Sequence, residues 1–428
     1  MNLNSLLLSS LLFFMLHLGP EVYSADRDIP PYFSAHISGK LDEIKKESRN
    51  GASFIFITDT HVRSNEMHSP QLIKYILDRT SIHTIIWGGD AIMQYGGPIE
   101  EQWKIQLCFD SVLNSNNIYK VRGNHDFSIL AKEKMPYRLL YSNEETAELL
   151  LKNAPSNIHR DTNEPGACYY FFDDRPNKVR FVIFDTTDSV PNKARSWGNI
   201  PHVHDSQLQW VADSAISTTP VGYGLVFVSH IPIPKQYNDN DSTLWKLRQI
   251  IDGISSLSSG IIGHVRYDFT NLKNVKVLMC LSGHIHSDSA MFMDGVLNVT
   301  TANDGKWNIK NKKESGSLKR NVGTVTEQCF DCFCINSNRK IIHAYRIGYG
   351  YDRHFHLEPI ILSVGKTKKI KSILKGTLSW TIRMNKRNDS FKPLSVKSGI
   401  VKGISEGSTT IVARDSKGNK EYFNITVQ

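Results

Sequence analysis

The chain lacks a long apolar segment after its N-terminal run. That run, from Ser5 to Leu18, is too short to span a bilayer comfortably. No Lys or Arg precedes it, and no cysteine follows it closely enough to carry a lipid. Gly19 and Pro20 end the run, and small residues before Ala25 suit a cleavage site. We therefore expect a signal peptide at residues 1–24 and a secreted, periplasmic or cell-surface protein, with an uncleaved anchor as the alternative.

Cysteine is also scarce, and its spacing excludes a zinc knuckle. The only close cluster, Cys329–Cys334, has no second cysteine pair to complete a metal site. Its alternating pattern is typical of a strand with Cys332 and Cys334 on one face. We interpret most of the six cysteines as small core residues. Because export would place the chain in an oxidising environment, one disulfide is compatible with the sequence.

The first 357 residues lack a surplus of either charge. The net charge is +9, and the segment from Glu358 onward carries all of it, with 14 Lys or Arg against 5 Asp or Glu. Nucleic-acid binding normally requires a basic surface, so the balanced part argues against a nuclease, although the basic tail keeps that hypothesis open. The tail could bind an anionic surface polymer. Alternatively, its lysines keep a small β-domain soluble and protect its strand edges.

Strand-like and helix-like segments alternate along most of the chain, which predicts an α/β fold with helices covering the sheet. The expected strands are continuous apolar runs, as in strands buried on both faces: Phe54–Thr58, Thr84–Trp87, Ile118–Val121, Arg180–Phe184, Leu225–Val228 and Lys276–Leu281. The expected helices are Gln71–Asp78, Glu100–Leu113, Glu144–Lys152 and Asp205–Ile216. Ligands of such folds bind at the carboxyl ends of the strands.

The pattern changes after Leu357. Short alternating runs at Ile400–Ile404, Thr409–Ala413 and Tyr422–Val427 predict strands of a small all-β sandwich. There is no internal repeat and no low-complexity linker. We therefore expect two domains, 25–357 and 358–428.

A cluster of polar residues follows each of five predicted strands. In chain order these are Asp59-Thr60-His61, Gly88-Gly89-Asp90, Gly123-Asn124-His125-Asp126, Ser229-His230 and Gly283-His284-Ile285-His286. Carboxylate and imidazole hold borderline divalent metals, and glycines let metal and substrate approach the backbone. Two such sites about 3.5–4 Å apart can clamp the attacking and leaving oxygens of a phosphoryl displacement. Any one cluster could arise by chance, but five in order predict a metal centre.

The ordered series DxH, GD, GNHD, H and GHxH resembles the calcineurin-like metallophosphoesterase superfamily, over roughly residues 51–300. The resemblance implies a four-layer α/β/β/α sandwich with two divalent metal ions, for which Mn, Zn, Fe, Co and Ni all remain open. It also implies hydrolysis of phosphate mono- or diesters by in-line attack of a metal-bound hydroxide.

The resemblance also assigns roles to single residues. The first metal would be bound by Asp59, His61 and His286. The second would be bound by Asn124, His230 and His284, and Asp90 would bridge the two. His125 would protonate the leaving group, and Asp126 would orient its imidazole. His230 rests on one residue alone. Its rival, His264, has Arg266 where a second ligand belongs, so we interpret His264 as a decoy.

The last seventy or so residues resemble a second family, the bacterial immunoglobulin-like group 2 domain. The residues that carry this resemblance are Ser363–Thr367, Trp380 and Gly399–Ile411. Such domains are spacers or surface modules, which motivates an alternative function: a surface-binding protein whose phosphoesterase scaffold is inactive. Decay of that kind erodes the metal ligands, and here the set is intact, so the sequence favours an enzyme.

Overall fold

The computed structural model describes residues 29–61, 68–92, 103, 106–107, 110–113, 117–126, 142–188, 202–233, 243–304, 319–383 and 393–428. The expected signal peptide and Cys108 lie outside these ranges. None of the helices in the described ranges has the length and apolar content that a bilayer crossing requires.

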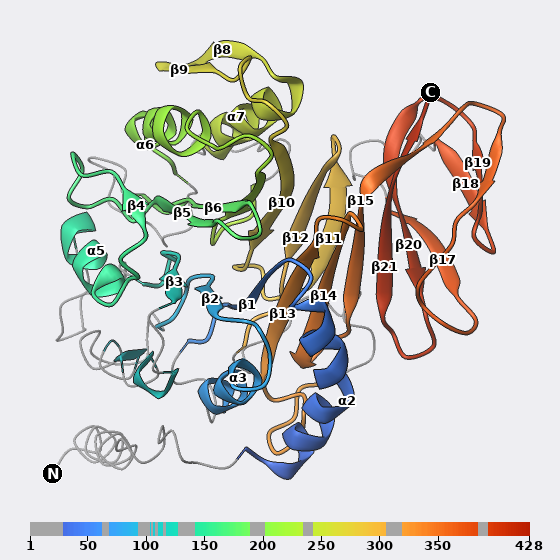
Figure 1. Cartoon of the computed structure of the whole chain (residues 1–428), viewed down its shortest axis with the longest axis horizontal. Coiled ribbons are helices and arrows are strands. Elements are labelled where there is room, and N and C mark those ends of the chain that lie inside the picture. The colour runs from blue at the N-terminus through green and yellow to red at the C-terminus, as the bar shows by residue number, and fades with distance from the viewer. Residues whose placement is uncertain are drawn as a thin grey trace, which may run out of the picture.

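Two mixed β-sheets form the centre of the molecule (Figure 1). The nine-stranded sheet has the order β17-β20-β21-β15-β14-β13-β1-β2-β3, and the seven-stranded sheet has the order β11-β12-β10-β7-β6-β5-β4. The strands of the first sheet are β1 (Ala52–Ile57), β2 (Thr84–Trp87), β3 (Ile118–Lys120), β13 (Cys329–Asn336), β14 (Ile341–Gly348), β15 (Arg353–Leu362), β17 (Ser379–Arg383), β20 (Gly407–Arg414) and β21 (Lys420–Val427). Those of the second are β4 (His159–Arg160), β5 (Tyr170–Asp174), β6 (Val179–Ile183), β7 (Gly224–Val228), β10 (Lys276–Ser282), β11 (Ser289–Met293) and β12 (Val296–Thr300).

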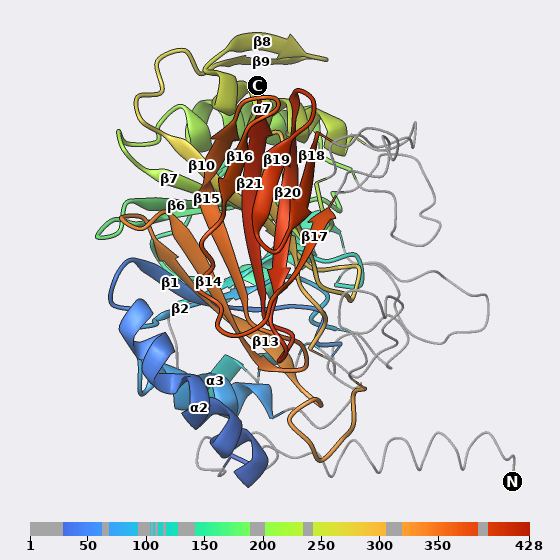
Figure 2. The same ribbon diagram turned by 90° about the vertical axis from the view of Figure 1, so that its right-hand side faces the viewer.

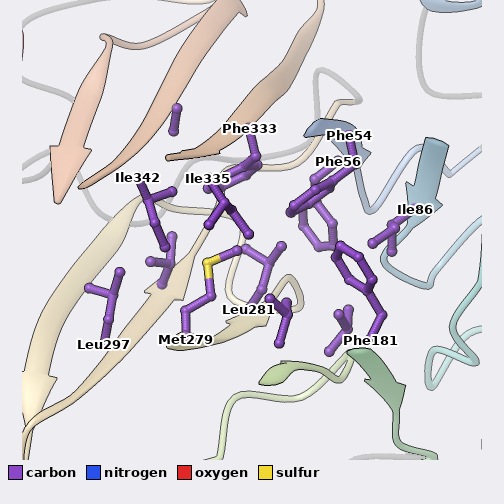
Figure 3. Close-up of a cluster of buried hydrophobic side chains, with 14 of the residues drawn as sticks. Phe54, Phe56, Ile86, Phe181, Met279, Leu281, Leu297, Phe333, Ile335 and Ile342 are labelled. Carbon is purple, nitrogen blue, oxygen red and sulfur yellow. The ribbon is translucent and has the colours of Figure 1, made fainter. Parts of the chain in front are cut away.

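The two sheets pack face to face through a continuous apolar core (Figure 3). Phe54 of β1 stacks on Phe333 of β13 at a centroid distance of 5.1 Å and meets Phe181 of β6 edge-on at 5.2 Å. Met279 and Leu281 of β10 fill the same layer. Each buried aromatic pair of this kind contributes roughly 0.5–1.5 kcal/mol beyond its area burial. The Phe54–Phe333 pair lies within one sheet, and the Phe54–Phe181 pair crosses between the sheets and helps to fix how one sits on the other.

Helices cover the outer face of each sheet, giving four layers. One apolar cluster joins β1, β2, β13 and β14 to α2 (Pro31–Glu47), α3 (Ser69–Leu77) and α5 (Asn143–Leu151). Another joins β6, β7 and β10 to α6 (Asp205–Trp210), the following π-helix η2 (Val211–Ile216) and α7 (Leu244–Ser256). The predicted α/β fold is confirmed. Half of the expected helix at 100–113 lies outside the described residues, and its described residues, 103, 106–107 and 110–113, are helical. The helices α2 and α7 were not expected.

The described cysteines are buried free thiols, at positions 168, 280, 329, 332 and 334. Cys332 and Cys334 lie on the same face of β13, against the helices. The interpretation as small core residues is therefore confirmed for these five.

The C-terminal residues form two β-layers, and one of them continues the nine-stranded sheet. A three-stranded sheet of β16 (Thr367–Lys369), β19 (Ile400–Gly403) and β18 (Leu394–Lys397) packs on β17, β20 and β21 over its own apolar core (Figure 2). β21 pairs in parallel with β15, which in turn pairs with β14. The expected boundary at 357/358 falls inside β15, whose Phe355 packs in the core between the two main sheets and whose Leu362 packs in the C-terminal core.

Candidate metal centre

The five polar clusters meet because their strands are parallel neighbours. β1, β2 and β3 pair in parallel, as do β6, β7 and β10 in the facing sheet. The carboxyl ends of these strands therefore open at one edge of the two-sheet core. Backbone bonds tie the clusters together within each sheet: Asp59 N–H donates to Gly89 O at 2.9 Å, and Gly283 N–H donates to His230 O at 3.1 Å.

One group of donors comprises Asp59, His61, Asp90 and His286, whose ligand atoms all lie within 4.8 Å of one another. Nε2 of His286 is 3.1 Å from Oδ1 of Asp59 and 3.3 Å from Nε2 of His61. Three of the four side chains are buried, and His286 is half-buried. Two carboxylates and two imidazoles at this spacing are a suitable donor set for a divalent ion.

A second group comprises Asp90, His230 and His284, again with all donor atoms within 4.8 Å. Oδ1 of Asn124 joins it, 3.1 Å from Nε2 of His230 and 2.9 Å from Nδ1 of His284. Oδ2 of Asp90 lies 3.1 Å from Nε2 of His230. The structure thus brings all seven expected ligands together, and Asp90 belongs to both groups.

The hydrogen bonds behind the imidazoles indicate that a cation fits here. Nδ1 of His230 lies 2.8 Å from the carbonyl oxygen of Gly88, and Nδ1 of His61 lies 3.2 Å from that of Ile92. A carbonyl only accepts, so each Nδ1 must donate, and in a neutral ring Nε2 then presents its lone pair to the centre. For His230 that lone pair faces the oxygens of Asp90 and Asn124. Acceptors converging in this way repel one another unless a cation or an added proton lies between them.

The pKa values of the buried groups also indicate that this site favours a positive charge at its centre. Burial alone would lower the pKa of His230, but the carboxylates of Asp90 and Asp59 outweigh it and raise the value to about 10. Burial lowers the pKa of His61 and of His284 to about 4. Despite burial, the imidazoles around Asp59 hold its pKa well below the usual range. Neighbouring imidazoles, that of His230 first, likewise hold the pKa of Asp90 well below the usual range despite burial. Both carboxylates therefore stay charged, and His61 and His284 stay neutral, as metal ligands must be.

The ligand loops hold an uncommon backbone conformation. Five of the candidate ligands have positive φ, which non-glycine residues rarely adopt: Asp59 (52°), His61 (42°), Asp90 (51°), His284 (69°) and His286 (54°). Such strain persists only where the surroundings impose it, and it clusters at functional sites.

Glycines beside the ligands are required by close contact. A Cβ on Gly123 would lie 2.2 Å from Oδ1 of Asp90. A Cβ on Gly283 would lie 2.1 Å from Oγ1 of Thr58 and 2.4 Å from Oδ2 of Asp59. Any larger residue at either position would push a ligand out of place.

The structure corrects the expected partner of Asp126. Its carboxylate does not orient His125; it accepts four backbone N–H groups, from Gly123 at 2.7 Å, Ala91 at 2.8 Å, Asp90 at 3.0 Å and Ile92 at 3.3 Å. Asp126 therefore fixes the loop that carries Asp90. The cause is geometric: the tight turn after β2 directs its amides at position 126, and a buried carboxylate satisfies them.

His125 lies at the mouth of the centre, with 27% of its side chain exposed. Its Nε2 is 3.8 Å from Oδ2 of Asp90, and its ring meets that of His61 edge-on at 5.0 Å. Among the described residues its Nδ1 has no hydrogen-bond partner. Its backbone N–H donates to Oδ1 of Asp90 at 2.8 Å, which holds this residue beside the ligands. His125 itself belongs to neither donor group.

Sequence reasoning missed two buried charge clusters that support the centre. Arg122, directly before the Gly123–Asp126 turn, is fully buried and pairs with Asp185. Asp288, two residues after His286, pairs with Arg346 and Arg353. The sequence offered one signal for each, a charged residue inside or beside an apolar strand. The decoy His264 lies exposed in the turn between β8 (Ser259–Ile262) and β9 (Val265–Asp268) and belongs to neither metal group.

Comparison with known families agrees with this geometry. Residues 52–288, more than half of the chain, match the family model of the calcineurin-like phosphoesterases. The chain belongs to this family and is a hydrolase that acts on phosphoester bonds. No curated protein sequence matches the chain.

Solved structures that align with the chain do so at low sequence identity. A dimetal phosphatase from Danio rerio is 13% identical, with a TM-score of 0.48, over 71% of this chain and 98% of that one. The phosphopantetheinyl hydrolase of Mycobacterium tuberculosis is also 13% identical, with a TM-score of 0.32, over 59% and 90%. A putative 5'-nucleotidase from Staphylococcus aureus is 11% identical, with a TM-score of 0.37, over 69% and 54%.

Proposed function

We propose that the protein is a two-metal phosphatase or phosphodiesterase. The observation that carries this proposal is the pair of donor groups sharing Asp90. One ion would be held by Asp59, His61 and His286. The other would be held by Asn124, His230 and His284, and Asp90 would bind both ions. When bound, such ions supply a water of lowered pKa as the nucleophile and offset the charge of the phosphate. Mn, Zn, Fe, Co and Ni all suit these ligands.

The protein's own side chains provide rigidity and a proton. The ligands are held at strand ends, and Asp126 fixes the Asp90 loop through four N–H groups, so little reorganisation is needed on binding. His125 is near enough to both groups to reach a leaving-group oxygen, and it is exposed enough to exchange protons with solvent. We assign to its imidazolium the donation of a proton to the departing alkoxide.

The first experiment strips the full chain of metal and reloads it with each of the five ions. We expect activity on p-nitrophenyl phosphate or bis-p-nitrophenyl phosphate to vanish without metal and to return with close to two ions per chain, counted by mass spectrometry. The preferred ester then separates monoesterase from diesterase. Full activity in stripped protein would contradict the proposal.

Replacing His125 with glutamine should lower kcat by about 10²–10⁴-fold, the range for a lost general acid. The loss should depend on the leaving group, because p-nitrophenolate departs readily without a proton and an alkoxide does not. We expect phenyl or alkyl phosphates to lose far more activity than p-nitrophenyl phosphate, with metal content unchanged. An equal loss on every ester would assign His125 to binding or structure instead.

The export of the protein and the nature of its last seventy residues complete the proposal. The apolar run before Ala25 supports secretion to the periplasm, surface or medium. The two β-layers after Leu357 support an immunoglobulin-like module, although one layer continues the catalytic sheet. Nothing favours the inactive surface-binding scaffold, since all seven candidate ligands are present and meet in space.

A further inference from the structure

A pocket of about 400 Å³ lies where the C-terminal strands join the main sheet. Arg339 and Lys340 line it from the turn between β13 and β14, and Lys368 and Lys369 line it from β16. This volume is within the range of small-molecule sites, about 300–1,000 Å³.

The rim of this pocket is strongly cationic. Five of its lining residues are Lys or Arg, the fifth being Lys371, and Glu358 is its one acidic member. Arg339 has a partner in Glu47, 3.2 Å away. Within the ranges that the structure describes, the four lysines form no ion pair. Cations crowded on one rim repel one another, and a bound anion would relieve that repulsion.

The floor of the pocket is apolar and does not cancel this charge. The ring of His356 stacks on Phe423 at a centroid distance of 4.6 Å. The carboxylate of Glu421, which contacts the lining residue His356, is fully buried and already occupied: Oε1 lies 2.5 Å from Nε2 of His356, and Oε2 accepts the N–H of Ile373 at 3.1 Å. The ammonium groups of the four lining lysines therefore remain available to bind an anion in the pocket.

The pocket is separate from the metal centre. β13 runs antiparallel to β1, with Ile335 opposite Ala52, so the β13–β14 turn lies at the amino end of β1. The metal ligands follow the carboxyl end of the same strand, after Ile57. The five steps from Ala52 to Ile57 rise about 3.3 Å each, which places the two sites on the order of 17 Å apart along the strand.

We propose that this pocket binds a phosphate-bearing anion with at least two neighbouring negative charges. Lysine ammonium groups are compact point charges that suit phosphate, and four lysines from two chain segments line this pocket. Three basic residues of the tail, Lys368, Lys369 and Lys371, thus line one pocket together with Arg339 and Lys340 from the β13–β14 turn of the main sheet. The anion's source is either a soluble phosphate compound or a lipid headgroup.

The test compares two full-chain variants with the same change in charge. Lys368→Ser/Lys369→Ser removes two rim cations, and the control Lys397→Ser/Lys417→Ser removes two exposed lysines of the same segment outside the pocket. Both variants leave the metal centre intact, so their activity should be unchanged. Any binding of a probe at the metal centre is the same in the two variants and does not affect the comparison. The probes are methylenediphosphonate, which cannot be hydrolysed, followed by calorimetry, and phosphatidic acid in phosphatidylcholine vesicles, followed by sedimentation.

We expect the pocket variant to bind at least one probe about tenfold or more weakly than the wild type, and the control variant to bind it normally. A selective loss with methylenediphosphonate supports a soluble ligand. A selective loss with vesicles alone supports a headgroup. Equal binding by the two variants in both assays, or no binding by the wild type, would overturn the proposal.

Discussion

Replacing Asp90 with alanine is expected to remove both metal binding and activity. Its carboxylate is the only side chain common to the two donor groups of the described residues. It also accepts the N–H of His125 at 2.8 Å and faces Nε2 of His230 at 3.1 Å. Loss of a residue that only orients a metal ligand costs up to about 100-fold. A shared ligand must cost more, so we expect kcat/KM to fall by more than that, and the metal content to fall to one ion or fewer.

Asp161→Ala is the matched control for this prediction. Asp161 is a buried aspartate as well, but it accepts hydrogen bonds from Tyr169 and Asn163, away from the metal groups. The control should keep two ions per chain and near-normal activity. If Asp90→Ala kept both ions and hydrolysed the ester, the bridging role of Asp90 would be refuted.

The ligands could be predicted from sequence because each follows its strand directly. Five parallel strands with polar carboxyl ends leave little freedom in where Asp59, Asp90 or His230 can lie. The residues behind them could not be placed in this way. Asp126 was expected on an imidazole, but it binds backbone amides, and the conformation of those amides depends on a loop that no local pattern encodes.

Strand pairing was beyond the sequence for a similar reason. Alternation predicted the strand at Tyr422–Val427, but it says nothing about which strand lies beside it. The structure pairs β21 with β15, so a segment expected as a separate sandwich shares a sheet with the catalytic fold.

The cluster behind His286 shows how this shared sheet reaches the centre. The guanidinium of Arg346 on β14 binds Asp288 at 2.7 Å and Asp331 at 2.9 Å, and that of Arg353 on β15 binds Asp288 at 3.2 Å. All four side chains are buried. Although burial opposes it, the two guanidinium groups hold the pKa of Asp288 well below its usual range. The contribution of the charged Asp288 to stability is full above its unfolded pKa of about 4. It is lost as the pH falls from that value through the lower pKa of the folded state.

Replacing Arg346 with methionine should therefore lower the free energy of unfolding by about 3–5 kcal/mol, because it leaves two buried carboxylates with one cation. That is a large part of the roughly 5–15 kcal/mol of a typical domain. Urea denaturation measures this loss of unfolding free energy.

Lys74→Met is the control, since the Lys74–Asp78 pair is exposed and an exposed i,i+4 pair contributes only about 0.3–0.5 kcal/mol. Asp288 is two residues from His286, so the Arg346 variant should also bind metal more weakly at neutral pH. A loss no larger than that of the control would show that Arg353 alone satisfies both carboxylates.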